Sequence, residues 1–163
     1  MVFVNYGEKI MKLKVKYLEN YNKEWGLLKS ENGNSGYDIR AGIAETIILK
    51  PNERKVIPNG IKLEIVPEEP HEINSEIQLR PRSGLAAKHG ITVVNTPGTV
   101  DYNYRGEVMT ILLNTGTDDF IINPGDRIGQ IVVTPIFKPT IIDASDVSDS
   151  NRGENGFGSS GVK

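Results

Sequence analysis

The residues best suited to chemistry lie in five short segments that are rich in arginine, aspartate and glycine. The chain has no cysteine and only two histidines, His71 and His89. Thiol nucleophiles, disulfides and a histidine-rich metal centre are therefore excluded. What remains is anion binding by arginine and backbone N–H groups, with carboxylates as bases or metal-binding groups.

The segment RPRSGLA (80–86) follows a predicted strand and has the composition of an anion-binding turn. Arg80 and Arg82 share a face if the strand continues through Pro81. Ser83 adds a hydroxyl, and Gly84 lets a ligand approach the backbone closely. A solvated turn with two surface arginines is the alternative.

The segment NTPGTVDYNYRG (95–106) predicts a hairpin that carries three useful side chains. The amide of Asn95 both donates and accepts, which suits the edge of a base. Asp101 is ionised at neutral pH and can orient a water molecule. Tyr104 offers a flat apolar face. Alternatively, the polar residues only satisfy hydrogen bonds within the turn.

Two further segments place single polar residues among apolar neighbours. In GDRIGQIVV (125–133), Arg127 and Gln130 are expected on opposite faces of a strand, and Gln130 is either an edge residue or a deliberate contact. In NSGYDIRAG (34–42), Asp38 is expected to pair with an arginine or to hold a water on Mg²⁺.

The fifth segment, RGENGFGSSG (152–161), combines an arginine, an aromatic residue and four glycines near the C-terminus. Arg152 could reach a phosphate and Phe157 could stack on a flat ring, which is worth about 1–3 kcal/mol for a base. A disordered tail is the alternative for such a composition.

The elements that must position these segments are predicted to be strands almost throughout. Period-two patterns and Pro, Gly and Asn punctuation predict strands at 12–18, 45–50, 54–66, 72–79, 91–95, 107–114 and 127–137. Residues 84–90 predict one or two helical turns. The expected organisation is an N-terminal extension (1–11), one β domain (12–142) and a flexible C-terminal arm (143–163).

Composition supports an ordinary globular chain. It has 163 residues, 37% of them hydrophobic and 25% charged, with a net charge of −2. The charge gives no reason to expect nucleic-acid binding, and no apolar run predicts a membrane span or a signal peptide. A cytoplasmic location is expected.

Taken in chain order, the segments at 34–42, 80–86, 95–106, 125–133 and 152–161 resemble the first to fifth motifs of the trimeric deoxyuridine triphosphate nucleotidohydrolases, the dUTPases. The resemblance extends from about residue 12 to the end of the chain. It implies an all-β distorted jelly roll of the β-clip type and a homotrimer with active sites at subunit interfaces. It also implies Mg²⁺-assisted hydrolysis of dUTP to dUMP and pyrophosphate, which limits uracil in DNA and supplies dUMP for thymidylate synthesis.

The same resemblance implies a role for each matching residue. Asp101 would activate the water that attacks the α-phosphorus, and Asp38 would position the metal through water. The residues implied to bind substrate are Arg82, Ser83, Gly84 and Gln130 (phosphates), Asn95, Gly98, Thr99, Val100 and Asp101 (uracil edge), Tyr104 (deoxyribose), Met109 (site lining), Arg152 (γ-phosphate), Phe157 (over uracil), and Gly158 and Ser159 beside it.

Departures from the family pattern are few. Asn155 stands where glycine is usual, Gly129 where alanine is usual, and Thr99 is a less common choice. A dCTP deaminase, which is similar in fold, needs a glutamate ten positions after the hairpin aspartate, where this chain has Ile111. A non-enzymatic interaction module is a second alternative, which the intact Asp101 and C-terminal arm disfavour.

Overall fold

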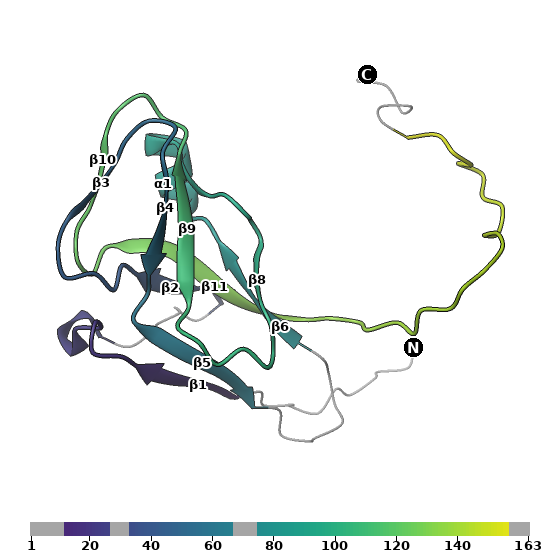
Figure 1. Ribbon diagram of the computed structural model, residues 1–163, viewed down its shortest axis with the longest axis horizontal. Coiled ribbons are helices and arrows are strands. Elements are labelled where there is room, and N and C mark those ends of the chain that lie inside the picture. The colour runs from purple at the N-terminus through teal and green to yellow at the C-terminus, as the bar shows by residue number, and fades with distance from the viewer. Residues whose placement is uncertain (1–11, 27–32, 67–74, 157–163) are drawn as a thin grey trace.

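The computed structural model describes residues 12–26, 33–66 and 75–156, and its regular structure is almost entirely β (Figure 1). The strands are β1 (Lys12–Tyr17), β2 (Tyr37–Arg40), β3 (Ile47–Leu49), β4 (Arg54–Pro58), β5 (Ile61–Val66), β6 (Ser75–Arg80), β7 (Ile91–Val93), β8 (Gly98–Val100), β9 (Met109–Asn114), β10 (Phe120–Ile122) and β11 (Arg127–Pro135). The helices are the short η1 (Lys23–Trp25) and α1 (Ser83–His89). The all-β prediction is confirmed.

Within the described residues, the strands form four antiparallel sheets. Their strand orders are β1-β5, β10-β3, β2-β11-β6-β8 and β4-β9-β7. Figure 1 shows β1 and β5 crossing the lower end of the body, with α1 at its upper end behind β9. In the four-stranded sheet, β11 lies between β2 and β6, and β8 is the edge strand.

One hydrophobic core joins these sheets. Alternating side chains in β5 show how it is built: Ile61, Leu63 and Ile65 are buried, while the residues between them are half-buried. Strands β6 and β9 contribute in the same way, and Ile131 of β11 is completely buried. Burying such side chains stabilises the fold by about 1.5–3 kcal/mol each.

Two details of the predicted strand pattern were wrong. The expected strand over 54–66 is two strands, because the chain turns at Asn59 and Gly60, where Gly60 has a φ of 68°. The expected hairpin over 95–106 is not a two-stranded unit: β7 pairs with β9, whereas β8 pairs with β6 in another sheet. The segment therefore links two sheets, and its turn residues let the chain pass from one sheet to the other.

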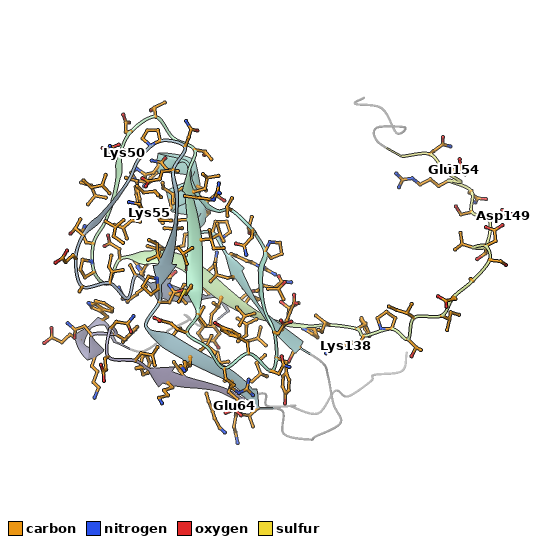
Figure 2. The ribbon with its side chains drawn as sticks, in the orientation of Figure 1. Lys50, Lys55, Glu64, Lys138, Asp149 and Glu154 are labelled. Atoms are coloured by element: carbon orange, nitrogen blue, oxygen red, sulfur yellow. The ribbon has the colours of Figure 1, made fainter. Side chains whose placement is uncertain are left out.

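Beyond β11 the described chain leaves the body. Residues 137–155 are all exposed and contain no helix or strand. Figure 1 shows this segment extending away from the sheets, and Lys138, Asp149 and Glu154 mark its course in Figure 2. Its large apolar side chains are uncovered, with Phe137 fully exposed and Ile141 at 89%. The domain boundaries remain predictions, and the extension over 1–11 lies outside the described residues.

A buried amide stabilises the turn between β4 and β5. Asn59 is completely buried, and its Nδ2 donates to the carbonyl of Arg40 at 2.8 Å. Its Oδ1 accepts from the hydroxyl of Thr110, which is also completely buried, at 3.0 Å. Because buried polar groups without partners are costly, this amide ties β2, β9 and the turn together.

We expect Asn59→Ala to lower the free energy of unfolding by about 2 kcal/mol, since two buried groups lose their partner. Urea unfolding at a fixed protein concentration measures the change. Thr46→Ala is the control, because its hydroxyl donates to Asn123 at an exposed position. It should cost less than about 0.5 kcal/mol. Equal stability of the two variants would contradict this role of Asn59.

Candidate active site

A cationic pocket of about 1430 Å³ opens where β2, the end of β6, the start of α1 and β11 meet. Among the described residues, its charged lining consists of Arg40, Arg80, Arg82, Lys88 and Arg127 against one carboxylate, Asp38. His89 also lines it. Such an excess of positive charge in a concave site attracts a multiply charged anion.

The Asp38 carboxylate holds two of these arginines in place. Its Oδ1 lies 3.0 Å from the Nε of Arg82, and its Oδ2 lies 3.1 Å from an Nη of Arg127. A second Arg127–Arg82 link runs through the backbone, where Arg82 donates to the Arg127 carbonyl at 3.3 Å. The structure thus shows Asp38 paired with arginines, which is one of its two predicted roles. Its other predicted role, holding a water on Mg²⁺, remains a prediction.

A bulge in β11 corrects the prediction that Arg127 and Gln130 face opposite sides. The pairing with β2 shifts register between Arg127 and Gly129, so Ile128 and Gly129 are buried consecutively. The extra residue turns Arg127 to the same side as Gln130, and both line the pocket. The glycine inside an apolar strand was the signal that could have predicted this bulge.

Gln130 is fixed by a glycine and by the end of β6. Its Nε2 donates to the carbonyl of Pro81 at 3.0 Å. A Cβ on Gly36 would overlap its side-chain oxygen, so any larger residue there would make the Gln130 side chain shift. Because β11 lies between β2 and β6, Gln130 is not an edge residue, and its predicted contact with a ligand remains a prediction.

The segment 80–86 delivers its polar groups to the pocket although β6 ends at Arg80. Arg82 is the N-cap of α1, and Ser83 and Gly84 form its first turn. Backbone N–H groups in a first helical turn have no partner within the helix. A Cβ on Gly84 would meet no atom within 4 Å, so the backbone there is open to a ligand.

An aromatic wall closes the other side of the pocket. Tyr21 and Trp25 both line it, with their rings 5.2 Å apart in an edge-on arrangement. Burial raises the pKa of the Tyr21 phenol, and the neighbouring Tyr17 adds to this effect. Sequence reasoning missed this wall, because it depends on Trp25 lying against Gly125, which is far away in the sequence.

The residues of 95–109 lie outside this pocket. Asp101 is exposed and follows β8, and its carbonyl accepts from the Tyr104 N–H at 3.0 Å. The Asn95 amide lies against Gly98, where a Cβ would be 3.1 Å from its Nδ2. Thr99 is exposed and Val100 half-buried, and Met109 is 49% exposed. Within one chain, the predicted base-reading loop (residues 95–109) is therefore separate from the cationic pocket.

The C-terminal residues are only partly described. Arg152 is exposed, and its Nε donates to the carbonyl of Asn155 at 2.7 Å. This bond closes a local turn, and Gly153 has a φ of 52° within it. The predicted contacts of Phe157, Gly158 and Ser159 lie outside the described residues.

The described residues contain neither a candidate membrane span nor a cluster of metal-ligating side chains. No helix there is long and apolar enough to cross a membrane. No group of three or more His, Cys, Asp or Glu side chains is placed there to hold a metal ion.

The fold and the pocket together define a β-sheet protein whose cationic pocket suits a polyanionic ligand, and the comparisons identify the family. The sequence profile of the dUTPase family matches residues 26–161. The deoxyuridine 5'-triphosphate nucleotidohydrolase of Treponema denticola is 48% identical over 142 residues, which are 86% of this chain and 94% of that protein. The chain belongs to the dUTPase family, and it is therefore a hydrolase of nucleotide metabolism.

Solved structures agree with this assignment. The Staphylococcus bacteriophage 80alpha dUTPase with dUPNHPP aligns with a TM-score of 0.77 at 27% identity, over 93% of this chain and 99% of that one. A mutant dUTPase from phage phi11 of S. aureus with a structural Mg(II) ion gives a TM-score of 0.70. At 22% identity over 85% of this chain and 99% of that one, it shows the fold alone. The β-rich jelly roll is thus confirmed.

We expect Asp38→Asn to lower kcat/KM about tenfold or more, because the neutral amide no longer holds both guanidinium groups in place. Thermal unfolding should change little, since the three side chains are 29–53% exposed and such pairs contribute at most about 1 kcal/mol. Steady-state kinetics and melting curves test this. Unaltered kcat/KM would show that the arginines need no such support.

The packing around the bulge lets us predict the effect of replacing Gly129 with alanine, the more usual residue of the family at this position in the segment 125–133. A Cβ on Gly129 would lie 3.4 Å from the Arg80 carbonyl and from Ile39, which is ordinary contact. We expect Gly129→Ala to raise the free energy of unfolding by about 0.5 kcal/mol, by restricting the unfolded chain. Chemical denaturation checks this, and a clear loss of stability would show that the bulge cannot accept a side chain.

Proposed function

We propose that the chain hydrolyses dUTP to dUMP and pyrophosphate at a site formed between copies of itself, with Asp101 as the base. Family membership supports the substrate and the reaction. The single observation that carries the proposed arrangement is the separation of the cationic pocket from Asp101. Each part is solvent-exposed in one chain, and neither alone could both hold and cleave the nucleotide.

The pocket would hold the phosphates. Arg82 provides planar donors suited to phosphate oxygens, and the Asp38 pair limits its movement. Ser83 and Gly84 add a hydroxyl and open backbone N–H groups, with Gln130 beside them. Phosphoryl transfer depends mainly on positioning and on neutralising charge, which this lining is suited to provide.

The cleavage step would use the exposed carboxylate of Asp101. It accepts a proton from a water molecule whose oxygen bonds to the α-phosphorus. The bond from that phosphorus to the oxygen bridging to the β-phosphate then breaks, and its electron pair leaves with pyrophosphate. General base catalysis of this kind contributes about 10²–10⁴ in rate.

A Mg²⁺ ion fits this pocket if the nucleotide carries it. Mg²⁺ keeps several waters and usually binds one or two carboxylates together with substrate phosphates. Asp38 is the one carboxylate lining the described pocket, and both its oxygens pair with arginines. Contact through water therefore suits Asp38 better than direct ligation. When bound, the ion would neutralise phosphate charge.

Assembly as a homotrimer would bring the two parts together. Exposed apolar side chains lie in the base-reading loop and next to it in the chain or sheet: Tyr104 and Met109 in the loop, Val94 just before it and Val56 on β4 are between 44% and 56% exposed. Apolar groups gathered in this way are typical of surfaces that a partner covers. The extended C-terminal segment, with Phe137 and Ile141 uncovered, is also suited to contact another copy.

The nucleoside would be read by the loop over 95–109. Asn95 and the backbone from Gly98 to Asp101 would pair with the uracil edge, and cytosine would leave buried groups unpaired. Sites of this kind reject the wrong partner by up to about 10⁴–10⁵. Tyr104 would pack under the deoxyribose, and Met109 would line the site. Arg152 and Phe157 would then close over the γ-phosphate and the base.

In the cell, this reaction would limit uracil in DNA and supply dUMP for thymidylate synthesis. We place it in the cytoplasm, where nucleotides are made. The related deaminase reaction is disfavoured, since Ile111 lies within β9 opposite Val56 and its side chain cannot transfer a proton.

We expect Asp101→Asn to reduce pyrophosphate release at least about 100-fold, because the amide cannot accept the water proton. Binding of a non-hydrolysable dUTP analogue should stay within a few-fold of the parent, as measured by calorimetry. Asp119→Asn, an exposed carboxylate before β10, is the matched control. Undiminished pyrophosphate release by Asp101→Asn would refute the assigned base.

Deleting residues 152–163 should reduce turnover at least about tenfold while leaving the assembly intact, because closure excludes water from the reacting groups. Pyrophosphate release and light scattering of the truncated protein measure the two effects. Full activity after truncation would rule out arm closure. Loss of the trimer would instead assign these residues to assembly.

A further inference from the structure

The Glu107 side chain anchors the end of the base-reading loop to a distant turn. Its Oε1 accepts the backbone N–H of Gly60 at 2.8 Å and the Nδ2 of Asn20 at 2.8 Å. Glu107 itself is half-buried, at the point where the loop enters β9. No role in the reaction described above uses this carboxylate.

The two groups that donate to Glu107, the Asn20 amide and the Gly60 N–H, are themselves held by further contacts. Asn20 also donates to the carbonyl of Gly42 at 3.0 Å, and the Gly42 N–H donates to Pro58 at 2.7 Å. A Cβ on Gly42 would lie 2.6 Å from the Gly60 nitrogen, so the two backbones are in close contact. Glu107 is therefore attached to a rigid turn rather than to a loose surface segment.

Tyr104 is held by the same residue through its backbone. Its hydroxyl donates to the carbonyl of Glu107 at 3.0 Å. Its ring lies directly over Gly106, where a Cβ would overlap the hydroxyl oxygen and Cζ of the ring. Only glycine permits this contact. The ring nevertheless stays 45% exposed, so part of it remains available to a ligand.

A second charged residue clamps the loop from the other side of Gly106. An Nη of Arg105 donates to the carbonyls of Tyr102 and Tyr104, at 2.8 and 3.0 Å. Its other Nη lies 3.6 Å from the Glu64 carboxylate on β5. Arg105 shapes the turn itself, whereas Glu107 fixes where that turn sits relative to the body.

We propose that Glu107 is a positioning residue that sets the selectivity for deoxyribose over ribose, by fixing where the Tyr104 ring stands. The inference rests on the proposed function, in which Tyr104 packs under the sugar. A ring held at its hydroxyl by Glu107 and pressed on Gly106 cannot move aside for a 2′-hydroxyl. Loss of the Glu107 anchor frees the loop end, and the ring can then yield to the extra oxygen.

The test compares kcat/KM for dUTP and UTP in three variants of the full chain. Glu107→Ala removes both hydrogen bonds, and the dUTP-to-UTP ratio should fall at least about tenfold. Glu107→Gln keeps a carbonyl oxygen at the position that accepts both bonds, so the ratio should stay within about threefold of the parent. Glu45→Ala, an exposed carboxylate elsewhere, is the matched control.

Gly106→Ala provides an independent measurement, because it displaces the ring and leaves the Glu107 carboxylate in place. It should lower the same ratio, and it keeps the proposal testable if Glu107→Ala does not fold. A crystal structure of either variant should show the Tyr104 hydroxyl moved from the Glu107 carbonyl.

The outcomes separate two failures. If the parent protein prefers dUTP but Glu107→Ala and Gly106→Ala keep its full selectivity, the role of Glu107 is overturned while the proposed function stands. If the parent and Tyr104→Ala are equally indifferent to the sugar, the proposed role of Tyr104 fails, and this inference fails with it. Selectivity lost with Ala and restored with Gln supports the proposal.

Discussion

The position of β11 between β2 and β6 is the constraint on which the pocket depends. Pairing with β2 places Gln130 opposite Asp38, and pairing with β6 places it opposite Arg80. The bulge before Gly129 then turns Arg127 toward the same pocket. Because the strands on both sides are fixed by hydrogen bonds, one carboxylate can hold two guanidinium groups at about 3 Å.

This arrangement gives the pocket a charge that the chain does not balance. Five cationic side chains and one carboxylate line it among the described residues, although the whole chain carries a net charge of −2. The positive charge is therefore concentrated by folding rather than by composition. A triphosphate complements such a site, and the loop carrying Asp101 and Tyr104 complements a nucleoside. Because these two surfaces lie apart in one chain, we propose that each active site combines the pocket of one copy with the loop of another.

Much of this could be predicted from the sequence, and the exceptions have physical causes. Alternating side chains predicted the strands, since burial on one face imposes period two. Motif residues predicted the pocket around Arg82 and Ser83, because arginine and glycine in a turn suit anions. The predicted orientation of Arg127 was wrong, because a bulge shifts the alternation of side chains by one residue. The anchoring of Tyr104 by Glu107 could not be predicted, because it depends on the turn at Gly60, far away in sequence.

The most direct test of the account is a crystal structure of the protein with a non-hydrolysable dUTP analogue and Mg²⁺. The account predicts the phosphates beside Arg82, Ser83 and Gln130 of one copy, and the Asp101 carboxylate of another copy one water molecule away from the α-phosphorus. An analogue bound with Asp101 remote from the α-phosphorus in every copy would contradict it.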